Sequence, residues 1–147
     1  MKTLLVSCMA FFAMSITEWQ PDFSIAKAKA VQDHRIILLS FSGSDWCIPC
    51  IRMHKEIFDS PQFYEVADSS LILYNADFPR KKKNELSKQL RMQNDSLAAV
   101  YNPEGKFPFT LLLSSDGKVL RSWEGYPEGG MIKFLEGIKE TAYAYKH

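Results

Sequence analysis

Two cysteines three positions apart hold the most reactive chemistry in this sequence, in the run Cys47-Ile48-Pro49-Cys50. One thiolate can attack a disulfide and a second thiol can release the mixed disulfide, and spacing of three on the first turn of a helix suits both steps. Unpaired N–H groups and the dipole at a helix N-terminus favour a thiolate there. We therefore predict that Cys47 attacks and that Cys50, one turn deeper, resolves.

A metal site is the alternative use of such a pair. Structural zinc needs four ligands, and the sequence offers no second Cys-x-x-Cys and no histidine pair beside this one. We expect no metal, and no cofactor other than a redox-active Cys47–Cys50 disulfide. His54 is expected on the flank of its helix, with proton transfer as the alternative because imidazole titrates near neutral pH.

The residues between the cysteines bear on the direction of exchange. Pro49 restricts the backbone before Cys50, and no histidine lies between the thiols to stabilise the thiolate of the reduced form. This favours a reducing protein over a strongly oxidising one.

The elements before and around the motif follow from its apolar pattern. A helix is predicted from Asp22 to about Val31, and Ile36 to Leu39 is apolar without alternation, as in a strand covered on both faces. A helix then begins near Cys47, and Ser60 before Pro61 predicts the start of another. Leu71 to Tyr74 is a second apolar strand, which ends at Asn75-Ala76-Asp77.

The second half of the chain begins with an exposed connection at 78–84, which contains Arg80-Lys81-Lys82-Lys83. We interpret this basic run as a solvated loop, with a docking patch for an acidic partner as the alternative. Helical patterning resumes at Glu85, with a restart predicted at Asn94. Two strands, 109–113 and 119–123, flank the hairpin signal Asp116-Gly117, and a helix containing Met131, Leu135, Ile138 and Ala142 closes the chain.

Composition bounds the partners. The chain has 147 residues and a formal net charge of +1, which gives no field strong enough to predict nucleic acid as a partner. Its length suits one domain, which we assign to residues 17–147, and we expect a monomer.

The first 16 residues have a different character. Lys2 supplies a short positive start and Thr3 to Ile16 carries no charge, which is typical of a secretory signal. Ala13-Met14-Ser15 offers a cleavage site. A lipobox ending at Cys8, or an uncleaved end, are the other interpretations.

Several motifs taken together resemble the thioredoxin-like family, and most closely its exported bacterial branch of small disulfide reductases and isomerases. The matching residues are Trp46-Cys47-Ile48-Pro49-Cys50, Met53, Phe58, Ser60-Pro61, Asp77, Phe107-Pro108 and Asp116-Gly117. The resemblance implies an α/β thioredoxin fold, with a mixed central sheet of four to five strands flanked by helices on both faces.

The same resemblance implies roles for individual residues. Cys47 and Cys50 are the catalytic pair, Pro108 follows a cis bond and packs against them, and Trp46 shields them. Pro49 and Phe107 complete the substrate groove and active-site packing. This sequence departs from thioredoxin at Ser40 and Leu73, which we align with its buried aspartate and lysine, and at Phe109, where thioredoxin has threonine.

The function expected on these grounds is a thiol–disulfide oxidoreductase, acting as a disulfide reductase or isomerase on exported proteins in the periplasm. A membrane-borne thiol donor would return it to the reduced state. The alternative is a redox sensor or partner-binding module that uses the same dithiol as a reversible latch.

Overall fold

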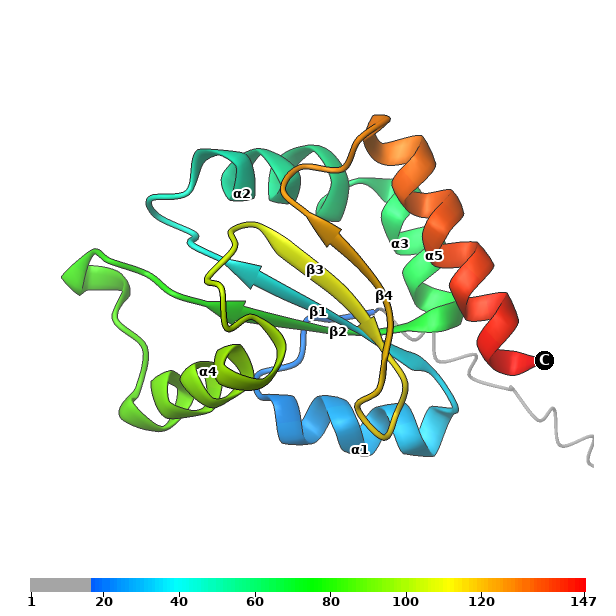
Figure 1. Ribbon diagram of the computed structural model, residues 1–147, viewed down its shortest axis with the longest axis horizontal. Coiled ribbons are helices and arrows are strands. Elements are labelled where there is room, and N and C mark those ends of the chain that lie inside the picture. Colours follow the sequence, from blue (N-terminus) through cyan, green and yellow to red (C-terminus); the bar gives the residue numbers. More distant parts are fainter. Residues whose placement is uncertain (1–16) are drawn as a thin grey trace, which may run out of the picture.

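The computed structural model describes residues 17–147, in which a four-stranded sheet separates two layers of helices (Figure 1). No helix in this part of the chain is long and apolar enough to cross a membrane. The signal segment predicted for residues 1–16, with its cleavage site and Cys8, lies outside the described residues. The strands are β1 (Ile36–Ser42), β2 (Leu71–Asp77), β3 (Phe109–Leu113) and β4 (Val119–Glu124). The helices are α1 (Phe23–Asp33), α2 (Ile48–Met53), α3 (Pro61–Ser70), α4 (Lys88–Tyr101) and α5 (Gly130–Lys146), with a π-helical segment η1 (His54–Phe58) continuing α2 and a 3-10 turn η2 (Lys82–Asn84) before α4.

The sheet has the strand order β2-β1-β3-β4. β1 runs parallel to β2 and antiparallel to β3, and β3 pairs with β4 as an antiparallel hairpin. All seven residues of β1 are buried, because helices cover both faces of the sheet. The predicted mixed sheet with β1 at its centre is confirmed, with four strands.

Two apolar clusters, one on each face of the sheet, form the core. On one face η1, α3 and α5 pack around Phe58, Phe63 and Phe134. On the other, α1 and α4 contribute Phe23 and Leu97 to a cluster with the opposite side chains of the strands. Figure 1 shows the same division, with α1 and α4 below the sheet and α2, α3 and α5 above it. The cluster under η1 fixes the helix that bears the cysteines.

Two helix starts predicted from the sequence are confirmed in atomic detail. The carboxylate of Asp22 accepts the N–H of Ile25 at 2.9 Å and caps α1. The hydroxyl of Ser60 accepts the N–H of Phe63 at 3.2 Å and caps α3, with Pro61 at the first helical position.

The helix restart predicted at Asn94 is wrong. α4 is continuous from Lys88, and its cap is Ser87, whose hydroxyl accepts the N–H of Leu90 at 3.2 Å. Asn94 is buried in the middle of this helix, where its amide nitrogen donates to the carbonyl of Asp77 at 3.0 Å. Its carbonyl accepts the hydroxyl of Tyr74 at 2.6 Å. A tertiary contact with β2 therefore explains this asparagine better than a local cap does.

Candidate active site

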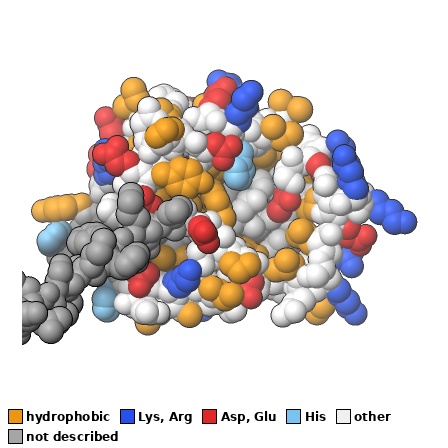
Figure 2. Space-filling model, turned by 180° about the vertical axis from the view of Figure 1, so that it is seen from behind, with side chains coloured by type: hydrophobic (Ala, Val, Ile, Leu, Met, Phe, Trp, Pro, Cys, Tyr) orange, Lys and Arg blue, Asp and Glu red, His pale blue; other side chains and the backbone are white. Residues whose placement is uncertain are grey.

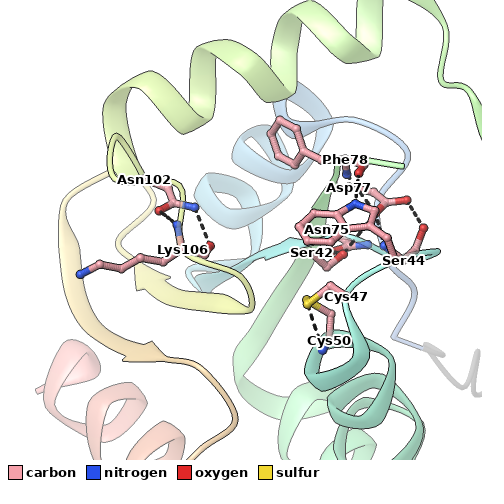
Figure 3. Close-up of a disulfide and its surroundings, with 10 residues drawn as sticks. Ser42, Ser44, Cys47, Cys50, Asn75, Asp77, Phe78, Asn102 and Lys106 are labelled. Atoms are coloured by element: carbon pink, nitrogen blue, oxygen red, sulfur yellow. Dashed lines mark hydrogen bonds between the residues drawn. A yellow bond between two sulfur atoms is a disulfide. The ribbon is translucent and has the colours of Figure 1, made fainter. Parts of the chain in front are cut away.

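Cys47 and Cys50 form a disulfide at the start of α2 (Figure 3). Cys47 is the N-cap residue of this helix, and its sulfur accepts the backbone N–H of Cys50 at 3.3 Å. The side chains are 5% and 2% exposed, respectively. Both cysteines are therefore buried in the disulfide state, with Cys47 slightly more exposed than Cys50.

The loop from β1 to α2 is held beside the dithiol by Trp46. A Cβ atom on Gly43 would lie 2.2 Å from Cε2 of the Trp46 ring, so only glycine leaves room for the indole at that position. The indole N–H donates to the carbonyl of Phe78 at 2.7 Å, and the ring meets that of Phe107 edge to face at a centroid distance of 5.4 Å. Trp46 therefore joins three loops that surround the cysteines.

The peptide bond between Phe107 and Pro108 is cis, and Pro108 is buried. Since Phe109 pairs with Phe41 of β1, this proline lies at the same edge of the sheet as the loop that leads to Cys47. The loop before Phe107 is held by two hydrogen bonds between the side chain of Asn102 and the backbone of Lys106. The amide nitrogen of Asn102 donates to the carbonyl of Lys106 at 2.9 Å, and its carbonyl oxygen accepts the N–H of Lys106 at 2.9 Å (Figure 3). Pro49 is exposed in the first turn of α2.

A polar network at the end of β2, which no local sequence pattern predicted, supports the same loop. Asp77 accepts hydrogen bonds from the backbone N–H of Ser44 at 2.9 Å and from its hydroxyl at 2.5 Å. Ser42 donates to the side chain of Asn75 at 2.8 Å (Figure 3). The sequence does contain a signal that could have predicted this network. The parallel strands β1 and β2 end at the same edge of the sheet, and each ends in polar residues.

Asp45, two residues before Cys47, is a second anchor that no local sequence pattern predicted. Its carboxylate accepts the backbone N–H groups of Arg80 and Lys81 and the side-chain amide of Asn84, each at 2.9 Å. The hydrogen bonds from Arg80 and Asn84 lower the pKa of Asp45 to about 2. The carboxylate therefore stays ionised near neutral pH and ties the basic loop to the motif.

A cavity of about 240 Å³ lies beside the inner cysteine, and its lining is Ser42, Ser44, Cys50, Ile51, His54, Lys55 and Asp59. The ring of His54 packs near those of Trp19 and Phe58, at centroid distances of 5.4 and 5.3 Å. Burial lowers the pKa of His54 below its ordinary value, although the carboxylates of Asp59 and Asp77 oppose this shift. His54 thus lies half-buried on the flank of its helix, next to this cavity.

Among residues 17–147, no group of three or more His, Cys, Asp or Glu side chains is arranged to hold a metal ion. The site therefore consists of a disulfide, aromatic and proline side chains around it, and two carboxylates that fix the neighbouring loops.

Comparison with known proteins assigns the chain to a family. Residues 23–137 match the model of a thioredoxin-like domain. The chain belongs to the thioredoxin-like family. It is 34% identical to the disulfide bond reductase DsbH of Chlamydia pneumoniae over 124 residues, which are 84% of this chain and 72% of that protein. The thioredoxin-related protein DsbJ of Chlamydia pneumoniae is 26% identical over 98 residues, 67% of this chain and 27% of the relative.

A solved structure of a DsbH oxidoreductase superposes with a TM-score of 0.77 at 29% sequence identity, covering 97% of this chain and 95% of that chain. The thioredoxin fold implied by the sequence motifs is confirmed by this match. Family membership, the 34% identical relative and the bonded Cys47–Cys50 pair make this thioredoxin-like protein a thiol–disulfide oxidoreductase, as expected from the sequence.

Proposed function

We propose that this oxidoreductase reduces or isomerises disulfides in exported proteins, with Cys47 as the attacking and Cys50 as the resolving thiol. The observation that carries the proposal is the placement of the pair: Cys47 is the N-cap residue of α2, and Cys50 lies in the first turn of that helix and is the less exposed of the two. The hydrogen bond from the N–H of Cys50 to the sulfur of Cys47 would also stabilise a thiolate there.

The reaction transfers two electrons to the substrate. The thiolate of Cys47 attacks one sulfur of the substrate disulfide, the other substrate sulfur leaves as a thiolate, and a mixed disulfide forms. Cys50 loses its proton and attacks the sulfur of Cys47, which releases the second substrate sulfur and forms the Cys47–Cys50 disulfide. A membrane-borne thiol donor then reduces this disulfide and completes the cycle.

The path of the substrate follows from the surroundings of Cys47. The ring of Trp46, the residue before Cys47, contacts that of Phe107, and Pro108 lies at the same edge of the sheet as the loop that leads to Cys47. We place the substrate chain along Phe107, with Trp46 and Pro108 packing against it and with Pro49 exposed at the entrance. The location we propose is the periplasm, which is an oxidising compartment where a reductase needs such a donor.

Catalytic reduction of an unrelated protein disulfide tests the function. With dithiothreitol as donor, we expect the wild-type protein to accelerate precipitation of reduced insulin, and Cys47→Ser to abolish the acceleration. Val31→Thr, an exposed change on α1, is the matched control and should leave the rate unchanged. If the protein reacted with no unrelated disulfide, a dedicated redox latch would replace the reductase.

The redox potential tests the direction. Equilibration with a glutathione series should give a value near that of thioredoxin, about −270 mV. A value near that of the periplasmic oxidant DsbA, about −120 mV, would instead favour thiol oxidation.

A further inference from the structure

The run Arg80-Lys81-Lys82-Lys83 is exposed, as predicted, but its backbone is hydrogen-bonded to the loop that carries the active-site motif. It lies between β2 and α4, and Asp45 accepts the backbone N–H groups of its first two residues at 2.9 Å. Asn84 adds a third bond to the same carboxylate at 2.9 Å. Because Asp45 is two residues before Cys47, these bonds hold the basic run at a defined place beside the dithiol.

Arg80, the first residue of the run, also contacts the motif through its side chain. The guanidinium carbon of Arg80 lies 3.7 Å from the centroid of the Trp46 ring, a cation–π contact with the residue that precedes Cys47. The same indole also contacts the ring of Phe107. One continuous surface therefore passes from the basic run over Trp46 to the groove where we place the substrate.

The charges of this run are available to a partner. In the part of the chain that the structure describes, no carboxylate lies within 4.0 Å of a charged nitrogen of residues 80–83. A cavity of about 400 Å³ lies next to the run, and its acidic lining residues are Asp77, Glu85 and Asp95. Asp77 is engaged by Ser44, and Glu85 is paired with Arg91 at 2.9 Å.

Seen from behind, Lys and Arg side chains gather along the right-hand edge of the molecule (Figure 2), the end at which Figure 1 shows the connection between β2 and α4. The whole chain carries a net charge of only +1, so four consecutive cations make a local feature. Their field extends over about 8–10 Å at moderate ionic strength. Arg80 contacts Trp46, which directly precedes Cys47, so the run begins next to the motif.

We propose that residues 80–83, together with Trp46, dock an acidic segment of the protein whose disulfide reacts at Cys47. The inference rests on the proposed function and adds a substrate class to it. Lysine and arginine attract carboxylates without requiring a defined sequence, which suits an enzyme that must accept several exported proteins.

Two peptides provide the test. Both contain the same disulfide loop, flanked by three glutamates in one and by three glutamines in the other. At low ionic strength we expect the reduced wild-type protein to show a kcat/KM about tenfold higher for the acidic peptide, and this ratio should fall at high salt. In the triple variant Lys81→Gln, Lys82→Gln, Lys83→Gln the ratio should fall to near one.

The matched control removes the same charge elsewhere, with Lys27→Gln, Lys29→Gln and Lys139→Gln on exposed positions of α1 and α5. It should keep the wild-type ratio, and an equal loss in both variants would overturn the docking surface. A wild-type ratio near one would do the same, as would binding to phosphatidylglycerol vesicles that depends on Lys81–Lys83 without any peptide preference. If neither peptide were reduced at all, the proposed function itself would fail, which is a separate result.

Discussion

At the scale of single residues, one helical turn distinguishes the two sulfur atoms. Cys47 caps α2 and accepts the N–H of Cys50, and Cys50 lies deeper at 2% exposure. Two carboxylates with no contact to either sulfur hold the loops around them: Asp77 binds Ser44, and Asp45 binds the backbone of the basic run. We infer that these carboxylates position the site.

Asn94 tests the importance of the buried polar contacts. Asn94→Ala leaves the hydroxyl of Tyr74 with one acceptor fewer and the carbonyl of Asp77 without its amide donor. Burial already raises the pKa of Tyr74 to about 12, which indicates a poorly hydrated hydroxyl. We expect Asn94→Ala to lower the free energy of unfolding by about 1–3 kcal/mol in urea titration.

Ser96→Ala, on the exposed face of the same helix, is the control for the Asn94 measurement and should change the free energy of unfolding by less than about 0.5 kcal/mol. Equal stability of Asn94→Ala and the wild type would show that water replaces both lost partners.

His54 gives a pH prediction. Burial lowers its folded-state pKa, so in the pH range just below the ordinary value of 6.5 the unfolded chain binds the proton more readily than the folded protein. The contribution of neutral His54 to stability is therefore complete above about pH 6.5 and is lost as the pH falls toward the lower folded-state pKa. We expect the free energy of unfolding to fall less between pH 7 and pH 5.5 in His54→Gln than in the wild type.

His34→Asn, at an exposed left-handed position that asparagine tolerates, is the matched control for His54→Gln. The same pH profile in wild type and His54→Gln would contradict the assignment of a half-buried imidazole whose pKa is lowered on folding.

At the scale of elements, local signals were sufficient where the chain forms its own contacts. Ser60-Pro61 predicted the start of α3, and the apolar run from Ile36 predicted a central strand, because caps and buried strands have short-range sequence patterns. Asn94 was misread because its partners come from β2. Asp45 was missed for the same reason, since its three donors lie 35 to 39 residues along the chain.

The cap of α3 is a prediction at this scale. Ser60→Ala removes the acceptor for the N–H of Phe63 and the donor to the carbonyl of Ile57. The expected loss is about 1 kcal/mol in the free energy of unfolding, measured by urea titration. Gln62→Ala, an exposed change in the first turn of the same helix, should have little effect. If both variants lost the same stability, helix propensity rather than capping would be responsible.

At the scale of the whole molecule, the sheet order β2-β1-β3-β4 brings the site together from distant segments. β1 delivers the loop to Cys47, β2 ends at Asp77, and the turn before β3 supplies Phe107 and Pro108. The motifs predicted this architecture through their resemblance to a family, and the order of elements supported it. Neither could predict the tether between Asp45 and the basic run, since it depends on how two loops meet in space.

Trapping of the mixed disulfide tests the division of roles between the cysteines. In a Cys8→Ser background, Cys50→Ser should accumulate a covalent adduct with a disulfide-containing peptide. Mass spectrometry should locate that adduct on Cys47, because the resolving thiol is absent. Cys47→Ser should form little or no adduct at Cys50, which is buried behind it. The assignment of Cys47 as the attacking thiol would be contradicted if the Cys47→Ser protein formed an adduct on Cys50 as fast as the Cys50→Ser protein forms one on Cys47. It would also be contradicted if the Cys50→Ser protein formed no adduct on Cys47.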